Sequence, residues 1–403
     1  MDEICPRHLL LIKHSSCHMC WVNTNILEKF GITPETPAPE NGRYVVEDGK
    51  LTGCLEENAC MQMRGQVPYP SAEKIRQAHI KLQKHYASYG ITTAQDGYLS
   101  SEMVEVYRDL IEHDAMMLDL VAYVHIPHYE RIKRQFDTLP PNSRIRLGGI
   151  KQYLDGEISV RTGWLREPYI DSGSYCGVPQ QTDEQLIGTM EYAAEHGLQI
   201  IYHSTGDAAN EQFVRCLEAA EKKHPNLKEL RPTLIHALVM DRPMLEKAAA
   251  LGAVISFFGA QPYYWCDAYI RSIGLERTRQ VCPARTALEC GTMFNFHHDD
   301  PVIEPDMMET VWSVVSRTTR EGVCLDEERI SVLDALRAVT VNAAYEYFEE
   351  DKKGTIEVGK AADFAVLAQD PLEADISELK NIAVLETYKD GVRIYKRVES
   401  LLS

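Results

Sequence analysis

Short apolar segments alternate with longer amphipathic ones over most of the chain. From residue 71, a helical pattern through AEKIRQAHIKLQKHYASYG ends at Gly90, and the apolar segment ITTAQD follows it. The same order repeats through the apolar segments LVAYVHI, RLGGIKQYL, LQIIYH, PTLIH, AVISFF and TMFNFHHD. Apolar, β-rich strands joined by helices are typical of a parallel sheet that is covered on both faces. The pattern therefore predicts an α/β fold built from about seven strand–helix repeats.

The length and regularity of these repeats favour a closed barrel. Right-handed repeats of this kind close most readily into an eight-stranded (β/α)8 barrel of the TIM type. An open doubly wound sheet is the alternative. The sequence contains neither G-x-G-x-x-G nor the P-loop motif with which many open sheets bind nucleotides. We therefore predict a TIM-type barrel.

The two ends of the chain have a different texture from the repeats. Residues 1–70 contain the turn signals Asn41-Gly42 and Asp48-Gly49, which predict a small hairpin in an elaborated loop region at the barrel mouth. Residues 71–348 hold the repeats and form the predicted barrel. Residues 349–403 alternate in a β pattern around turn residues, which predicts a small C-terminal β element.

Charge and cysteine content narrow the class of partner. The net charge of −18 argues against a nucleic-acid partner or an acidic membrane surface. No segment approaches the roughly 18 uninterrupted apolar residues of a membrane span, and the N-terminus lacks the features of a secretory signal. The 11 cysteines have no regular spacing, as expected for reduced thiols. We expect a cytoplasmic protein that acts on a small-molecule substrate, with a homodimer left open as the simplest assembly.

Polar residues stand at the ends of several predicted strands. His203 ends LQIIYH, His236 ends PTLIH, and Asp299 ends TMFNFHHD. The C-terminal strand ends of an α/β barrel meet at one mouth, where active sites lie. Two imidazoles and a carboxylate at that mouth could bind Zn²⁺ or a similar ion. Each residue alone is also typical of an ordinary structural hydrogen bond, so the pattern by itself leaves both interpretations open.

A lysine in the middle of an apolar strand is the least ordinary feature of the sequence. Lys151 lies in RLGGIKQYL, and Asp155 follows it closely. The ordinary interpretation is an ion pair between these two residues. The other is a lysine whose amine has reacted with CO₂ to give a carbamate, an anionic oxygen ligand that can bridge two metal ions.

Other residues near the strand ends also have two interpretations. His297 and His298 precede Asp299, and the alternation of a strand turns only one of the two towards the barrel interior. His125 and His128 could line the mouth, although such loop histidines are usually solvated or structural. The aromatic segment SFFGAQPYYWCDAY could contact an apolar substrate group, but we favour simple packing over the mouth.

The order of several motifs resembles the amidohydrolase superfamily, in the branch that contains N-substituted formamide deformylase. The resemblance covers nearly the whole chain. It is carried by CHMCWVNTNIL, TGCLEENA, YGITTAQDG, IKQYLDGEISVRTGWLREPYID, YHSTGDAAN, HDDPV and KGTIEVGKAADFAVLAQDPL, in that order. Membership implies an amidohydrolase that cleaves C–N bonds other than peptide bonds, of amide or formamide type, on a TIM-type barrel with a composite β-sandwich.

The resemblance also implies roles by position. His203 and His236 match metal ligands, and Lys151 matches the carboxylated lysine that bridges the metal, with one or two Zn²⁺ ions bound. Asp299 matches a ligand that is also the catalytic general base. In that role the aspartate takes a proton from the attacking water and delivers it to the leaving nitrogen.

Three further residues are implied to lie near the substrate: His18, Glu57 and His298. Glu57 would otherwise be an ordinary loop glutamate. His298 stands where the family usually has a serine, which could alter the surroundings of the metal. The family's usual Ile-Glu-His around the second histidine reads Leu-Ile-His at residues 234–236.

The largest departure from the family pattern is a missing pair of histidines. The family's first barrel strand carries His-x-His, which supplies two metal ligands, and no His-x-His occurs in this sequence. We therefore expect the first barrel strand to be missing and the metal to bind weakly. The alternative to a C–N hydrolase is a non-catalytic remnant or a binding protein that keeps the barrel without the chemistry.

Overall fold

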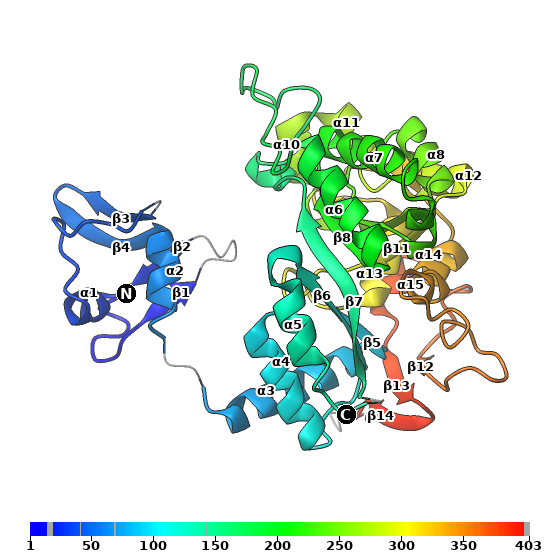
Figure 1. Cartoon of the computed structure of the whole chain (residues 1–403), viewed down its shortest axis with the longest axis horizontal. Helices are drawn as coiled ribbons and strands as arrows, with labels where there is room; N and C mark the ends of the chain where they lie inside the picture. Colours follow the sequence, from blue (N-terminus) through cyan, green and yellow to red (C-terminus); the bar gives the residue numbers. More distant parts are fainter. Residues whose placement is uncertain (14–18, 41, 68–69, 142, 399–403) are drawn as a thin grey trace. The chain divides into compact units, whose positions relative to one another are not determined.

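The computed structural model of the chain describes residues 1–13, 19–40, 42–67, 70–141 and 143–398. These residues fall into two compact units, Met1–Lys74 and Ile75–Ser403. Figure 1 shows the chain coloured along its sequence.

The first unit contains a four-stranded antiparallel sheet in the order β1-β2-β4-β3. The strands are β1 (Leu11–Lys13), β2 (Met19–Val22), β3 (Gly42–Glu47) and β4 (Lys50–Glu57), and the helices are α1 (Thr24–Lys29) and α2 (Asn58–Arg64). The predicted hairpin is confirmed as β3–β4, with Asp48 and Gly49 both at positive φ in its turn. Cys20 and Leu55 are fully buried in a small core. Residues 1–70 thus contain more regular structure than their turn signals suggest.

The second unit is built on a seven-stranded parallel sheet in the order β11-β10-β9-β8-β7-β6-β5. Strands that follow one another in the chain are neighbours in the sheet, so the order never reverses as it does in a doubly wound sheet. The strands are β5 (Thr93–Asp96), β6 (Asp119–His125), β7 (Ile145–Tyr153), β8 (Gln199–Ser204), β9 (Thr233–His236), β10 (Val254–Phe258) and β11 (Met293–His297). The fold is the predicted α/β barrel of the TIM type, with seven parallel strands among the described residues.

Helices join these strands and pack beside one another on the outside of the sheet, as α6, α7 and α8 do in Figure 1. The helices of this part of the chain are α3 (Ala72–Ser88), α4 (Ser101–Glu112), α5 (Tyr129–Phe136), α6 (Asp183–His196), α7 (Asp207–Glu221), α8 (Arg242–Ala250), α9 (Gln261–Tyr264), α10 (Cys266–Ile273), α11 (Leu275–Arg279), α12 (Ala284–Cys290), α13 (Met307–Ser316), α14 (Val332–Ala338) and α15 (Val341–Glu346).

Helix α6 shows how local sequence sets an element's bounds. The side chain of Thr182 accepts a hydrogen bond from the backbone N–H of Gln185, whose own side chain bonds back to the Thr182 N–H. This capping box satisfies two N–H groups that the helix itself leaves unpaired. Gly197 ends the helix in the left-handed conformation at φ 64°, which costs glycine little.

The C-terminal end of α15 closes the N-terminal ends of the barrel strands. Gln199, the first residue of β8, accepts a hydrogen bond from the Tyr123 hydroxyl at 2.6 Å and donates one to the Glu346 carbonyl at 2.9 Å. The Tyr347 hydroxyl donates to Gln95 of β5 at 2.6 Å. The inner face of the sheet is therefore filled by side chains at this end.

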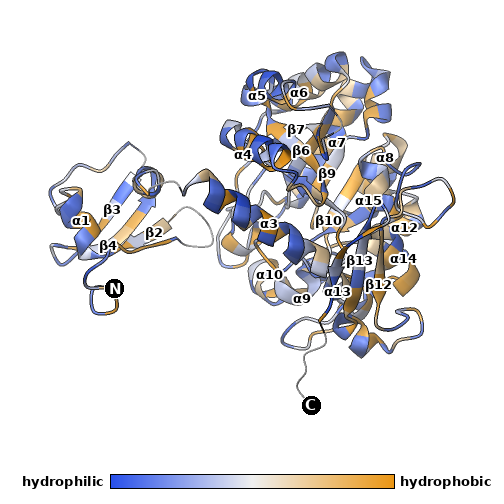
Figure 2. Ribbon diagram, turned by 90° about the horizontal axis from the view of Figure 1, so that it is seen from below, coloured by the Kyte–Doolittle hydropathy of each residue, from blue (hydrophilic) through white to orange (hydrophobic). Residues whose placement is uncertain are grey.

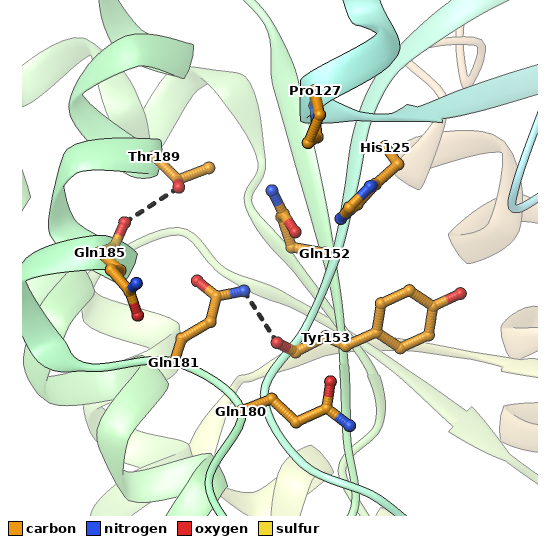
Figure 3. A pocket seen from close by; sticks show the side chains of 8 residues that line it. All are labelled: His125, Pro127, Gln152, Tyr153, Gln180, Gln181, Gln185 and Thr189. Carbon is orange, nitrogen blue, oxygen red and sulfur yellow. Dashed lines mark hydrogen bonds between the residues drawn. The ribbon is translucent and has the colours of Figure 1, made fainter. Parts of the chain in front are cut away.

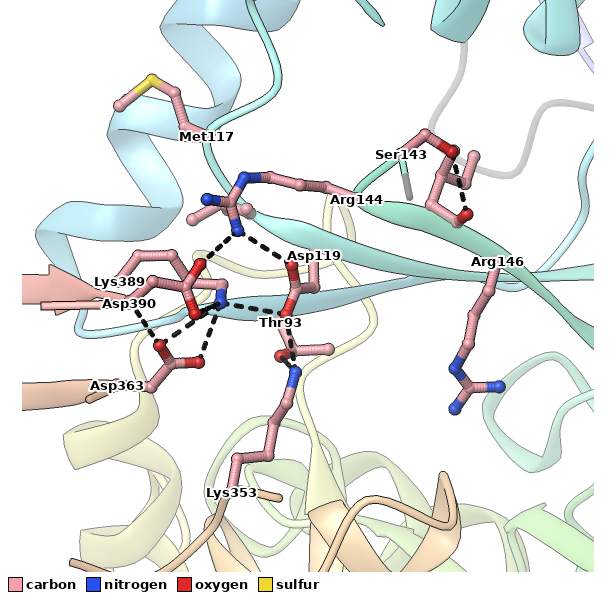
Figure 4. Close-up of polar contacts among 12 residues, drawn as sticks. Thr93, Met117, Asp119, Ser143, Arg144, Arg146, Lys353, Asp363, Lys389 and Asp390 are labelled. Carbon is pink, nitrogen blue, oxygen red and sulfur yellow. Dashed lines mark hydrogen bonds and ion pairs between the residues drawn. The ribbon is translucent and has the colours of Figure 1, made fainter. Parts of the chain in front are cut away.

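A three-stranded antiparallel sheet follows the barrel, in the order β12-β13-β14, and confirms the predicted C-terminal β element. Its strands are β12 (Phe364–Leu367), β13 (Val384–Lys389) and β14 (Val392–Lys396). Charged side chains attach it to the first residues of the barrel strands (Figure 4). Lys389 is 2% exposed and lies 3.1 Å from both Asp119 and Asp363, while Lys353 contacts Asp119 at 2.7 Å.

Apolar residues concentrate along the strands of the sheet, while the outer sides of α4 and α5 are largely hydrophilic (Figure 2). This is the distribution of a sheet covered by amphipathic helices. No helix in the described ranges combines the length and apolar character that crossing a membrane requires.

Candidate metal centre

The histidines predicted at two strand ends lie side by side in the structure. His203 is the penultimate residue of β8, and His236 is the last residue of the neighbouring strand β9. Their ring centroids are 4.6 Å apart, with the planes at 73°. The two imidazoles therefore meet at the C-terminal end of the sheet, as the strand-end argument predicted.

The hydrogen bond of His203 determines which of its nitrogens is available. Its Nε2 lies 2.9 Å from the backbone carbonyl of Gly156, in the loop after β7. A carbonyl oxygen only accepts, so a neutral His203 donates from Nε2 and keeps a lone pair on Nδ1. Nδ1 is thus the atom that can act as a ligand or a base.

Both imidazoles are held in the neutral form. Burial, together with the charge of Lys151, lowers the pKa of His203 to about 4. Burial lowers the pKa of His236 well below its usual range, with His203 and Lys151 acting in the same direction. A neutral imidazole is the form that binds a metal ion.

Lys151 lies beneath these histidines without the ion pair that was its ordinary interpretation. Its side chain is buried, and the pairing with Asp155 is wrong: Asp155 accepts backbone N–H groups of Trp164 at 2.8 Å, Thr205 at 2.9 Å and Gly206 at 2.8 Å instead. Burial lowers the pKa of Lys151 to about 8, against the opposing charges of Asp299 and Glu346. Its amine therefore loses a proton more readily near neutral pH than the amine of an ordinary lysine.

Asp299 follows β11 by two residues and is exposed at the mouth, with φ at 56°. Its negative charge raises the pKa values of both Lys151 and His203, so it lies within electrostatic range of them. Non-glycine residues at positive φ are uncommon and are found preferentially at functional sites. The four predicted metal residues are thus brought to one end of the barrel.

Of the two histidines before Asp299, His297 faces this centre. Its Nε2 lies 3.1 Å from Nδ1 of His236, and the ring centroids are 4.9 Å apart. His298 turns the other way: its ring is 5.9 Å from that of Tyr86 in α3, and its Nδ1 accepts the backbone N–H of Asp300. The expected alternation is confirmed, but sequence reasoning had assigned a role to His298 and none to His297.

The other two predicted substrate contacts are placed differently. His18 lies outside the described residues. Glu57 is the last residue of β4 in the first unit, with φ at 48°. The substrate roles of Glu57 and His298 stay predictions.

The ligand chemistry of the centre fits a divalent metal ion. Two neutral imidazoles and a carboxylate are the nitrogen and oxygen donors that Zn²⁺ prefers, and a carbamate on Lys151 would add oxygen. Among the residues that the structure describes, however, no three His, Cys, Asp or Glu side chains are already gathered closely enough to hold an ion. The donors are of the right kind and at the right end of the barrel, but they do not form a ready-made cage.

A polar cavity of about 320 Å³ opens next to this centre (Figure 3). It is lined by His125, Pro127, Gln152, Tyr153, Gln180, Gln181, Gln185 and Thr189, from the ends of β6 and β7 and the start of α6. No lining side chain carries a fixed charge. The ring of Tyr153 joins the cavity to the centre, because it lies 5.5 Å from the ring of His203 and 5.4 Å from Nζ of Lys151.

The aromatic segment that begins at the end of β10 packs as expected. Phe257 and Phe258 are buried in the core, and Trp265 lies 5.1 Å from the ring of Phe258. These side chains therefore support the mouth and do not line the cavity.

Comparisons with known proteins agree with this architecture. N-substituted formamide deformylase of Arthrobacter pascens is 25% identical over 415 residues, covering 99% of this chain and 76% of the deformylase. The protein YtcJ of Bacillus subtilis (strain 168) is 27% identical over 414 residues, covering 98% of this chain and 76% of YtcJ.

Solved structures share the fold. An uncharacterized metal-dependent hydrolase from Pyrococcus horikoshii has a TM-score of 0.75 at 21% identity, covering 92% of this chain and 73% of that one. A variant of atrazine chlorohydrolase TrzN from Arthrobacter aurescens, in complex with zinc and atraton, has a TM-score of 0.51 at 14% identity, covering 83% and 74%.

The comparison with protein families gives the most extensive match. The model of the amidohydrolase family matches residues 1–395, which is nearly the complete sequence. The parallel barrel and the ligand types at its strand ends are consistent with that match. The chain therefore belongs to the amidohydrolase family.

Proposed function

We propose that this protein is a metal-dependent hydrolase of small molecules that cleaves a C–N bond of the amide or formamide type. The observation that carries the proposal is the convergence of His203, His236, Lys151 and Asp299 at the open end of an amidohydrolase barrel. The deformylase of Arthrobacter pascens supports the choice of bond.

The proposed ligands are His203, through its free Nδ1, His236, Asp299 and Lys151. When bound, a divalent ion such as Zn²⁺ supplies a Lewis acid that polarises a carbonyl and lowers the pKa of water. Lys151 would take part as a carbamate: its uncharged amine forms a bond to the carbon of CO₂ and releases a proton. The lowered pKa of Lys151 makes that amine available.

Asp299 is the proposed general base. Because its carboxylate is exposed at the mouth, it can accept a proton from the attacking water and deliver that proton to the leaving nitrogen. An imidazole that binds the ion through one nitrogen carries a proton on the other, so His203 and His236 have no lone pair left with which to accept the proton of the water.

The polar cavity is the proposed site for the rest of the substrate. Its amide and hydroxyl groups favour an uncharged group that forms hydrogen bonds, because a charged group would find no opposite charge in the lining. The oxygens of Gln180 and Gln181 are suited to accept, since their amide nitrogens already donate to backbone carbonyls of Asp155 and Tyr153.

One observation favours the second candidate, a barrel that no longer catalyses. The described residues contain no ready-made group of three metal donors. A protein with this barrel and cavity but without bound metal would be a binding protein for small polar molecules.

Metal analysis combined with hydrolysis distinguishes the two. The purified protein, the His203→Ala variant and the His196→Ala variant are incubated with Zn²⁺, desalted and analysed for zinc content, then assayed on N-substituted formamides and acetamides. His196 lies on the exposed side of α6, so its variant is the matched control. The hydrolase proposal expects bound zinc and amine release that His203→Ala abolishes and His196→Ala retains. Absence of zinc and of amine release in all three proteins would leave the binding protein.

A further inference from the structure

A continuous row of hydrogen bonds runs through the barrel from the candidate centre to α15. Starting from His236, the row continues to His297 at 3.1 Å, to Ser256 at 3.0 Å and to Asn295 at 2.7 Å. The side-chain amide of Asn295 then donates to Oε2 of Glu346. The row joins β9, β11, β10 and α15, and sequence reasoning assigned no role to its last four members.

The inner members of the row are enclosed by protein. Ser256, Asn295 and Glu346 are 5%, 3% and 2% exposed. A buried polar group without a hydrogen bond destabilises the fold by the full free energy of its desolvation. These side chains are therefore strongly held in their hydrogen bonds. The row is therefore a fixed feature of the barrel interior.

The acceptor at its lower end gives the row a direction. Oε2 of an ionised Glu346 can only accept, which turns the NH₂ group of Asn295 towards it. Oδ1 of Asn295 then faces Ser256 and accepts the proton of its hydroxyl. Because the one hydroxyl proton of Ser256 is already used in its hydrogen bond to Asn295, the Ser256 oxygen acts as the acceptor for His297. His297 therefore carries its proton on Nδ1.

The direction continues to His236. A neutral His297 that is protonated on Nδ1 has a lone pair on Nε2, so this atom accepts from Nδ1–H of His236. We propose that Glu346, acting through Asn295, Ser256 and His297, fixes His236 in the Nδ1–H tautomer and thereby presents the Nε2 lone pair of His236 at the barrel mouth. These four residues are positioning residues for His236.

The direction of the row is the same whether Glu346 is ionised or carries a proton on Oε1. Oε1 of Glu346 is buried and has no hydrogen-bond partner among the described residues. A proton on Oε1 would leave Oε2 free to accept from Asn295. Only a proton on Oε2 would reverse every hydrogen bond in the row. Nδ1 of His236 would then accept a hydrogen bond, and the proton of His236 would be on Nε2.

The tautomer stands on these hydrogen bonds alone, whereas the use of Nε2 as a metal ligand rests on the proposed function. Other groups that orient a ligand histidine act in this way, and their removal commonly costs about 10–100-fold in metal affinity. His297 and its partners would give His236 the same support from inside the barrel.

Nuclear magnetic resonance measures the tautomer directly. The metal-free protein is labelled with ¹⁵N-histidine, and long-range ¹H–¹⁵N spectra are recorded well above the pKa of about 7 to which burial raises Glu346, so that this carboxyl is ionised. The His236 signals are assigned by their loss in His236→Gln. We expect His236 to carry its proton on Nδ1. A wild-type His236 that is protonated on Nε2 would overturn the proposal.

Two serine variants test the row without touching the centre. Ser256→Ala removes the acceptor for Nδ1–H of His297 and is expected to shift His236 from one tautomer to a mixture. Ser313→Ala is the matched control, because Ser313 is also buried but its hydroxyl has no hydrogen-bond partner among the described residues. Equal tautomer populations in Ser256→Ala and wild type would overturn the proposal, provided that thermal unfolding shows both to be folded.

Zinc affinity, measured by competition with a chelator, separates this inference from the proposed function. A shift of tautomer in Ser256→Ala together with about 10–100-fold weaker zinc binding supports both. A shift of tautomer with unchanged zinc affinity confirms the row and overturns the ligand role of His236.

Discussion

The ammonium group of Lys389 lies 3.1 Å from the carboxylate of Asp119, and this contact joins the C-terminal sheet to the beginning of β6. The same ammonium contacts Asp363 and Asp390. These residues lie at the N-terminal ends of the strands, opposite the candidate metal centre, where charged residues serve stability and not catalysis.

Replacement of Lys389 by alanine is expected to destabilise the protein strongly. The variant removes the buried cation beside Asp363, whereas Asp119 keeps Lys353, and removing one partner of a buried ion pair commonly costs about 3–5 kcal/mol. Urea unfolding measures the loss. Lys396→Ala is the control, since Lys396 is 60% exposed and 3.8 Å from Glu386, so we expect a loss of about 1 kcal/mol or less. Equal losses in the two variants would contradict the anchoring role of Lys389.

The buried carboxyl of Glu346 is expected to make stability fall as the pH rises. Burial raises its pKa from 4.5 to about 7, with Asn295 and Lys151 opposing the shift. Between these two values the folded protein binds more protons than the unfolded chain, so the free energy of unfolding decreases as the pH increases. Glu346→Gln should flatten this decrease when urea midpoints at pH 5 and pH 8 are compared. Glu276→Gln, at a 90% exposed side chain, should leave it unchanged.

The fold was predictable because its repeats are local. Each strand of the barrel is an apolar segment followed by a helix, and the capping box at Thr182 and Gln185 is visible in the sequence. The sheet of the first unit was not predictable in the same way. Its β1–β2 and β2–β4 pairings join segments separated by irregular sequence, and no periodicity announces such contacts.

The candidate centre was predictable only in part, for a related reason. Strand ends identify His203 and His236, but the choice between His297 and His298 depends on where β11 stops, which a pattern does not fix to one residue. The role of Glu346 was invisible, because a single glutamate in a helix is normally solvated. Asp155 was misassigned to Lys151 because nearness in the chain was taken as contact, whereas Asp155 binds the backbone after β8.

Lys151 is expected to lower the stability of the metal-free protein although hydrolysis requires it. Burial lowers its pKa from 10.5 to about 8, so between these values the unfolded chain binds more protons and stability rises with pH. Below pH 8 the folded state bears the cost of a buried charge. In metal-free, CO₂-depleted protein at pH 7, Lys151→Met should therefore raise the free energy of unfolding by about 1–3 kcal/mol and abolish hydrolysis. Lys223→Met, at a 67% exposed site, should change neither. A less stable Lys151→Met would show that Lys151 contributes net stabilising contacts.

The polar cavity is expected to select substrates through binding and not through the chemical step. Gln152 lines the cavity and is 6% exposed, and leucine is similar in size but cannot form hydrogen bonds. Gln152→Leu should raise KM about 3–10-fold for an amide with a polar, uncharged substituent, as the loss of one hydrogen bond predicts. Its kcat should change little, because the contact is present in the bound substrate and in the transition state alike.

The same assay on an amide with an apolar substituent of equal size should show no rise in KM, and the exposed Gln280→Leu should match the wild type on both substrates. An equal rise in KM for the polar and the apolar substrate would mean that Gln152 shapes the mouth and does not bind the substituent.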